Sequence, residues 1–242
     1  MLYFNKEIIM KRTKHLLSKS RSLCLLCILA LSILIIESKS EAEPRTEDDL
    51  IEMSCGENDN ATKVLVAYDT IHGSTAEVAE YIGYGLCDQG FKVDVQLAYN
   101  AVNISTYDAV ILGSPVYQFS WMEGIKSFIR KNKSALSLMP TAYFMLGVSM
   151  ATDTPENRES AKELFIDPVL DEFPEVVLLT LGFFGGAYNF SENEYNTLEW
   201  IVLKIIGFIL GGTQEEGDWR NWDTIDTWTE EIVSELESAD SL

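Results

Sequence analysis

The pattern of apolar and polar positions after residue 62 predicts strands that alternate with helices. Five short segments are nearly continuous in apolar residues or alternate apolar with polar ones, as strands of a largely buried sheet do. These predicted strands span residues 63–68, 91–97, 107–112, 141–148 and 176–184. Val78, Ile82 and Leu86 recur at helical spacing before Gly90, a residue typical of helix ends. Further helices are predicted at 122–131, 156–170 and 222–236.

Strands that alternate with helices indicate a parallel sheet with helices on both faces. The five units fit an α/β doubly wound sheet of strand order 2-1-3-4-5, with an insertion at about 187–217, after or within the fifth strand. In such a sheet, ligands bind beyond the carboxyl ends of strands one, three and four. We therefore expect the loops at 69–75, 113–121 and 148–155 to form the walls of a ligand crevice.

The first of these loops has the composition of a phosphate site without cationic side chains. It leads into a helix, whose N-terminus offers unpaired N–H groups and roughly half a positive charge. Hydroxyls can donate to phosphate oxygens beside those N–H groups, and Gly73 allows the backbone to approach the ligand closely. The alternative is an ordinary helix cap made by Ser74 or Thr75. The predicted ligand contacts are Thr70, Ile71, His72, Gly73, Ser74 and Thr75, with exposure to solvent as the alternative for His72.

The first 40 residues have a different character from the rest of the chain. Several basic residues precede an uncharged apolar run at 23–36, which is typical of a secretory signal peptide. An uncleaved membrane anchor is the alternative, although a bilayer span needs roughly 20 apolar residues. Either interpretation places the remaining chain outside the cytoplasm, secreted or anchored at the outer face of the membrane. Residues 41–62 are acidic and polar, and we interpret them as a solvated linker before a domain at 63–237.

Charge excludes some classes of function. The formal net charge is −20, and residues 41–242 carry 36 Asp and Glu against 11 Lys and Arg. A domain this acidic repels phosphate backbones, so nucleic-acid binding is not expected. The two histidines, His15 and His72, provide little material for acid–base catalysis.

The four cysteines do not predict a metal site. Cys24 and Cys27 form a CxxC inside the apolar run, without a second pair of ligands. Cys55 and Cys87 are able to pair if the domain is exported, but the sequence does not show whether they lie within bonding distance.

The phosphate-loop motif resembles the FMN phosphate loop of flavodoxins. It reads Tyr68-x-Thr70-x-x-Gly73-Ser74-Thr75. Residues 112–117, Leu-Gly-Ser-Pro-Val-Tyr, resemble the second flavin loop of the same proteins. The resemblance implies that the domain binds FMN.

Three further segments resemble the menaquinone-dependent protoporphyrinogen dehydrogenases, a flavodoxin-like family. Residues 139–144 are similar to the fourth strand of that family, and 211–213 and 218–222 to the end of its long insertion. By position, the second and third loops would flank the flavin ring, with core or surface packing as the alternative for the aromatic residues. The residues so implied are Ser114, Pro115, Val116, Tyr117, Gln118, Phe119, Trp121, Val148, Ser149 and Met150.

The resemblance implies an FMN-dependent oxidoreductase that passes electrons from an organic substrate, of porphyrinogen type, to a quinone. An export signal argues against haem synthesis, because that substrate is normally intracellular. An electron carrier that docks to a redox protein is the alternative, and a shell that has lost FMN is a third. The apolar segment at 200–210 is interpreted as a buried helix, a lid over the substrate, or a contact with a membrane surface or second copy.

Overall fold

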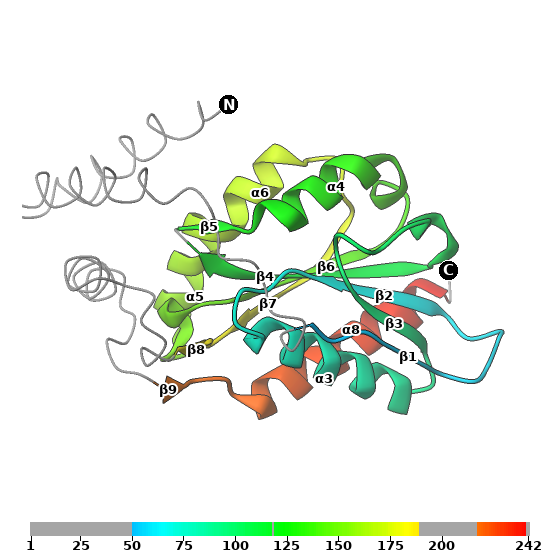
Figure 1. The fold of residues 1–242 in the computed structure, drawn as a ribbon, viewed down its shortest axis with the longest axis horizontal. Coiled ribbons are helices and arrows are strands. Elements are labelled where there is room, and N and C mark those ends of the chain that lie inside the picture. The colour runs from blue at the N-terminus through cyan, green and yellow to red at the C-terminus, as the bar shows by residue number, and fades with distance from the viewer. Residues whose placement is uncertain (1–49, 118, 189–216, 241–242) are drawn as a thin grey trace, which may run out of the picture. The chain divides into compact units, whose positions relative to one another are not determined.

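A parallel sheet forms the centre of the fold in the computed structural model, which describes residues 50–117, 119–188 and 217–240 (Figure 1). Its order is β3-β2-β4-β6-β7, which is the predicted order 2-1-3-4-5. The fold class is therefore confirmed. The strands are β2 (Lys63–Tyr68), β3 (Lys92–Leu97), β4 (Ala109–Tyr117), β6 (Thr141–Leu146) and β7 (Leu178–Phe184).

Helices cover both faces of the sheet (Figure 1). One face carries α3 (Ser74–Asp88) and α8 (Trp222–Asp240), and the other carries α4 (Glu123–Leu136), α5 (Pro155–Ala161) and α6 (Asp167–Glu172). The continuous helix predicted at 156–170 is interrupted by a π-helical turn, Lys162–Ile166. Pro168 in the first turn of α6 gives the reason, because proline supplies no N–H to the preceding turn.

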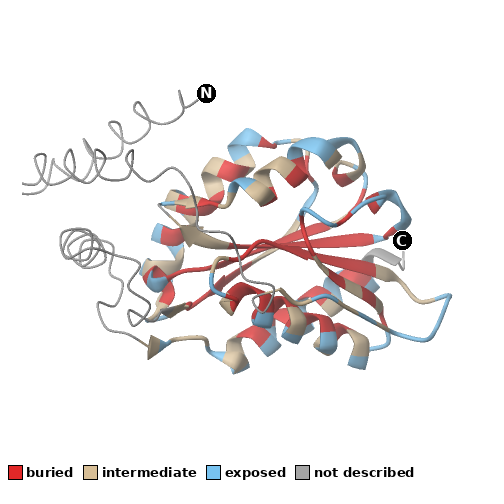
Figure 2. Ribbon diagram, in the orientation of Figure 1, coloured by how far each residue is buried: buried red, intermediate tan, exposed pale blue. Residues whose placement is uncertain are grey.

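The strands are buried on both sides, which explains their nearly continuous apolar sequences (Figure 2). Along β2, Leu65 and Ala67 pack towards α4, whereas Val64 and Val66 pack towards α3 and α8. Each face of the sheet therefore has its own apolar cluster, and the alternation of side chains along each strand divides residues between them.

Two parts of the predicted organisation are corrected. Within the predicted linker, β1 (Met53–Cys55) pairs antiparallel with β3 and extends the sheet. The third strand does not stop at residue 112, because β4 continues to Tyr117 and turns back into β5 (Ser120–Trp121). Both errors have one cause: isolated polar or turn-forming residues join a strand when a neighbouring strand satisfies their backbone groups.

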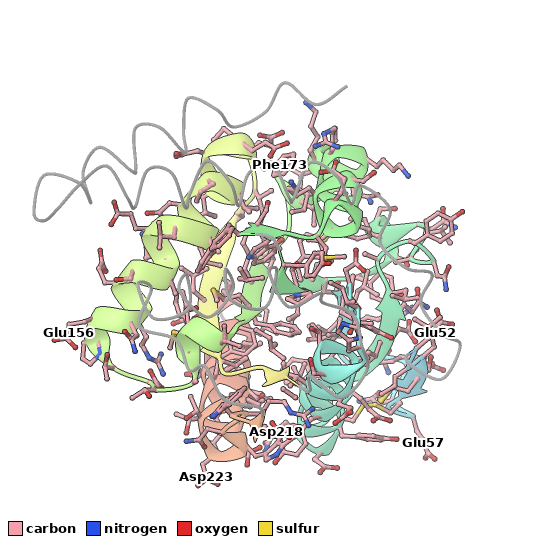
Figure 3. The ribbon with its side chains drawn as sticks, turned by 60° about the vertical axis from the view of Figure 1, so that its left-hand side comes forward. Glu52, Glu57, Glu156, Phe173, Asp218 and Asp223 are labelled. Carbon is pink, nitrogen blue, oxygen red and sulfur yellow. A yellow bond between two sulfur atoms is a disulfide. The ribbon has the colours of Figure 1, made fainter. Side chains whose placement is uncertain are left out.

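A disulfide between Cys55 and Cys87 joins β1 to the last turn of α3 (Figure 3). The two Cα atoms are 6.1 Å apart. The hydroxyl of Tyr68 reinforces this edge, since it donates to the carbonyl of Ile51 and accepts from its N–H, both at 2.7 Å. The segment before the domain is therefore tied to it by covalent and hydrogen bonds.

Replacing both cysteines, Cys55→Ser with Cys87→Ser, should lower the free energy of unfolding by about 2–4 kcal/mol, because the bridge restricts the unfolded chain. Urea unfolding measures the loss. Dithiothreitol should destabilise the unmodified protein and leave the double variant unchanged. An identical unfolding midpoint for both proteins under non-reducing conditions would contradict this expectation.

Several predicted features lie outside the described residues. They are the signal or anchor at 1–40, most of the insertion at 187–217 with its apolar segment 200–210, and Gln118. The part of the insertion that the structure describes is a small ribbon of β8 (Ala187–Tyr188) and β9 (Gly217–Asp218). Among the described helices, none is both long and apolar enough to cross a bilayer.

Candidate functional site

The parallel register brings the carboxyl ends of β2, β4 and β6 to one edge of the sheet. Tyr68 is level with Gly113, and Gly113 is level with Phe144. The chain leaves β2 towards β3 on one side, and β4 lies on the other, so the strand order reverses between β2 and β4. Ligands of open α/β sheets bind at such a reversal. The loops selected from the sequence therefore meet where a ligand crevice is expected.

The first loop folds tightly around its own polar groups before α3 begins. Gly73 has a φ of 79° in the left-handed region, which a glycine adopts without strain. The N–H of Gly73 donates to Oγ1 of Thr70 at 3.1 Å, and the N–H of Thr70 donates to Oδ1 of Asp69 at 2.8 Å. Because Gly73 is the N-cap, the cap predicted as the alternative for Ser74 or Thr75 is not formed.

The carboxylate of Asp69 belongs to the support of this loop. The residue is buried, and its Oδ2 occupies the space that a Cβ on Gly124 would need, at the first turn of α4. The positive end of α4 is a favourable place for a carboxylate. The acidic residue at the start of the loop therefore packs against the first turn of a second helix.

Two buried hydroxyls in the first and third loops have no hydrogen-bond partner among the described residues. They are Oγ1 of Thr75 and Oγ of Ser149. A buried hydroxyl without a partner costs free energy, and a bound water or ligand that supplies a partner would offset that cost. Around them, Ser74 and Ile71 are half-buried and His72 is exposed, which agrees with the alternative for His72. This set of neutral donors, beside the N-terminus of α3, fits a phosphate and the polar edge of a flavin.

The second loop is a hairpin whose residues divide between support and surface. Oγ of Ser114 accepts the N–H of Met122 at 2.9 Å and donates to the carbonyl of Pro115, closing the hairpin. Trp121 is 2% exposed and its ring lies 5.3 Å from that of Tyr143, so the core alternative describes it. The half-buried residues are Pro115, Val116 and Tyr117, while Phe119, with a φ of 62°, is exposed.

The third loop begins with a short 3-10 helix, Val148–Met150, in which Val148 is exposed and Met150 is buried. Its backbone is attached to β7, because the N–H of Gly147 donates to the carbonyl of Phe184 at 3.1 Å. The exposed or half-buried apolar groups of the second and third loops remain candidates for contact with a flat ring, and they include Pro115, Val116, Tyr117, Phe119 and Val148.

A hollow of about 170 Å³ lies beside the third loop. Its lining includes Met150, Phe183, Trp219, Asn221 and Thr224. Sequence reasoning did not select it, because residues 219–224 reach the third loop only through the tertiary fold. The hollow adds an aromatic surface next to the predicted flavin loops.

Arg220 lies near the start of α3, and the sequence did not predict it as a site residue. Its Nη1 lies 2.6 Å from Oε2 of Glu77, in the first turn of α3, although the two residues are 143 positions apart. The hydrogen bonds of Asp218, and then those of Glu77, raise the pKa of the Arg220 guanidinium. Arg220 in turn lowers the pKa of the Asp218 carboxyl. A cation is thus held against the helix that starts at the first loop.

Comparisons with known proteins give sequence matches over more than half of the chain. The model of the flavodoxin domain matches residues 65–216. The protoporphyrinogen IX dehydrogenase (quinone) of Escherichia coli strain K12 is 22% identical over 183 residues, which cover 71% of this chain and 94% of that protein. The protein of the same description from Leishmania major is 23% identical over 157 residues, 62% of this chain and 64% of that protein.

Solved structures of similar fold include flavodoxins and flavoproteins. A flavodoxin from the domain Archaea has a TM-score of 0.39 at 14% identity, covering 61% of this chain and 98% of that one. A flavoprotein in complex with FMN from Lactobacillus acidophilus NCFM has a TM-score of 0.38 at 14% identity, covering 51% of this chain and 93% of that one.

Proposed function

Because the chain belongs to the flavodoxin domain family, we propose that it binds FMN at the carboxyl ends of β2, β4 and β6. The first loop would hold the phosphate through Thr70, Ser74, Thr75 and the N–H groups at the start of α3. The second and third loops would hold the ring. The observation that carries this proposal is the buried hydroxyl of Thr75, which has no hydrogen-bond partner in the described part of the chain and follows the left-handed Gly73 at a helix N-terminus.

We propose further that the protein is an oxidoreductase, which uses this flavin to pass electrons from an organic substrate to a quinone. Bound FMN supplies the redox chemistry, and the chain's own residues position its ring and control access to it. The support is the similarity to quinone-dependent protoporphyrinogen dehydrogenases over 94% of the length of the Escherichia coli protein. A porphyrinogen is the corresponding candidate for the substrate.

An electron carrier is the second candidate, favoured by the charge of the chain. Residues 41–242 hold 36 acidic and 11 basic side chains. An acidic surface steers the approach of basic redox proteins and orients them for docking. In that case the exposed edge of the flavin would exchange electrons directly with a protein partner.

One set of measurements separates these candidates. The purified full chain is examined for a flavin spectrum, titrated with FMN, and then supplied with protoporphyrinogen and a menaquinone analogue. Oxidation of the porphyrinogen that depends on the quinone supports the enzyme. A yellow protein inert towards both supports the carrier, and a colourless protein that does not bind FMN contradicts both.

The proposed location is outside the cytoplasm. The apolar run at 23–36 after basic residues supports export, and so does the bridge between Cys55 and Cys87, since disulfides persist in oxidising compartments. Fractionation of cells, followed by alkylation of free thiols and mass measurement, tests this proposal. A cytoplasmic protein with both thiols reduced would overturn it.

A further inference from the structure

The guanidinium of Arg220 contacts three residues, which are Asp218, Glu77 and Trp222. Its Nε and Nη2 lie 2.8 and 2.5 Å from the two carboxylate oxygens of Asp218, and its Nη1 contacts Glu77. The guanidinium carbon is 5.0 Å from the ring centroid of Trp222, which in turn lies 4.8 Å from the ring of Tyr81 on α3. The side chain of Arg220 is only 9% exposed. Planar guanidinium groups suit such fixed, bidentate positions.

The network joins two segments that are distant in sequence. Asp218 belongs to β9 and lies where the start of α8 faces α3 (Figure 3). Glu77 lies in the first turn of α3, and its N–H donates to the carbonyl of Gly73 at 3.0 Å. The charge of Arg220 is therefore bound to the carboxylate of a residue that lies one helical turn from Gly73.

The electrostatic situation of the first loop makes this cation important. The loop at 69–75 contains no lysine or arginine but contains the buried Asp69, and Glu77 lies two residues after the loop. Asp218 adds a second carboxylate on the same side, and both carboxylates are about half exposed. A phosphate dianion placed at the N-terminus of α3 would be repelled by both of these charges if nothing offset them.

We propose that Arg220 determines the preference of the site for a phosphorylated flavin, by offsetting the charges of Glu77 and Asp218 beside the phosphate loop. The inference rests on the proposed binding of FMN. The guanidinium of Arg220 donates its hydrogen bonds to Glu77 and Asp218. Arg220 would therefore affect specificity by reducing the repulsion between these carboxylates and the phosphate, without contacting the phosphate itself. The preference for FMN over riboflavin, which lacks the phosphate, is the quantity that this arrangement controls.

The test compares the affinities of FMN and riboflavin in four variants, by quenching of flavin fluorescence at low salt. Arg220→Gln should lower the ratio of the two affinities about tenfold, since an uncompensated Glu77 then faces the phosphate. Arg220→Lys keeps the charge and should stay within about threefold of the unmodified ratio. Glu77→Gln should raise the ratio about threefold, and Glu77→Gln with Arg220→Gln should recover most of the loss.

Arg130→Gln provides a matched control. Arg130 also contacts two carboxylates, Glu123 at 3.2 Å and Glu172 at 2.8 Å, but it lies on α4, on the opposite face of the sheet. Its removal should leave the ratio unchanged. Added salt should bring the FMN-to-riboflavin affinity ratio of Arg220→Gln closer to that of the unmodified protein, because salt screens the half-exposed carboxylates.

The outcomes separate this inference from the proposed function. If the unmodified protein binds no FMN, the proposed function fails. If it binds FMN but Arg220→Gln weakens FMN and riboflavin equally, Arg220 has only a structural role and the inference is overturned. If Arg220→Gln does not fold, Glu77→Gln tests the same inference, because Glu77 is exposed and its replacement should not prevent folding. An unchanged or lowered ratio in Glu77→Gln overturns the inference.

Discussion

Replacing Thr70, Ser74 and Thr75 together by alanine should weaken FMN binding about a thousandfold or more. Each hydroxyl that donates to a charged phosphate contributes roughly 1.5–3 kcal/mol, and about 1.4 kcal/mol corresponds to tenfold in affinity. The backbone N–H groups at the start of α3 remain, so some binding of phosphate should persist. Fluorescence titration with FMN measures the change, and riboflavin, which has no phosphate, should lose little.

A control for this variant removes three hydroxyls from exposed helical positions, Ser134→Ala, Thr227→Ala and Ser234→Ala. That protein should bind FMN with unchanged affinity. Thermal unfolding of the apoproteins shows whether the loop variant is folded, which matters because Thr70 and Thr75 are buried. Undiminished FMN affinity in the loop variant, or equal losses for FMN and riboflavin, would contradict the proposed phosphate site.

Phe144→Ala should lower the free energy of unfolding by about 3–5 kcal/mol, the range found for large aromatic residues in protein cores. Phe144 is fully buried on β6, and its ring centroid lies 6.1 Å from that of Phe184 and 5.9 Å from that of Trp228. The ring also fills the space in which a side chain on Gly113 would lie. Alanine would leave a cavity between the sheet and α8, and urea unfolding of the apoprotein measures the cost.

Tyr99→Ala is the matched control, since it also removes an aromatic ring, but from a position that is 83% exposed. Its effect on stability should stay within about 0.5 kcal/mol. A loss for Phe144→Ala no larger than for Tyr99→Ala would mean that the cluster of Phe144, Phe184 and Trp228 does not stabilise the fold. The unfolding free energy of Leu86→Ala, which opens a cavity beside α3, would then show whether the rest of this apolar cluster stabilises the fold.

The type and order of the elements could be predicted because each depends on neighbours a few residues away. Val64 to Val66 are apolar on both sides of the strand, which indicates a strand buried on both faces, and that strand begins the predicted sheet. The strand order followed from the alternation of strands and helices together with general rules of chain connection. The first helix was predicted for the same local reason, from Val78, Ile82 and Leu86 at helical spacing, although its N-cap is Gly73 and not Ser74 or Thr75.

The side chains of the site were predicted less completely, because orientation depends on what packs against each residue. Ser114 and Trp121 were both predicted to lie beside the flavin ring, yet one closes the hairpin and the other fills the core. Sequence offered both positions for Trp121, and the partner that decided between them, Tyr143, lies on another strand. The position of a loop in a doubly wound sheet is thus easier to predict than the direction of its side chains.

The sequence by itself determined the parallel sheet and its order, and it predicted that a loop of neutral donors follows the first of the five parallel strands. Only the tertiary structure decided that Cys55 meets Cys87, that β1 joins the sheet, and that Arg220 meets Glu77. The physical reason is the range of the interactions. Periodicity records burial within one element, whereas a pairing across 32 or 143 positions depends on the path of the whole chain and has no signature in local spacing.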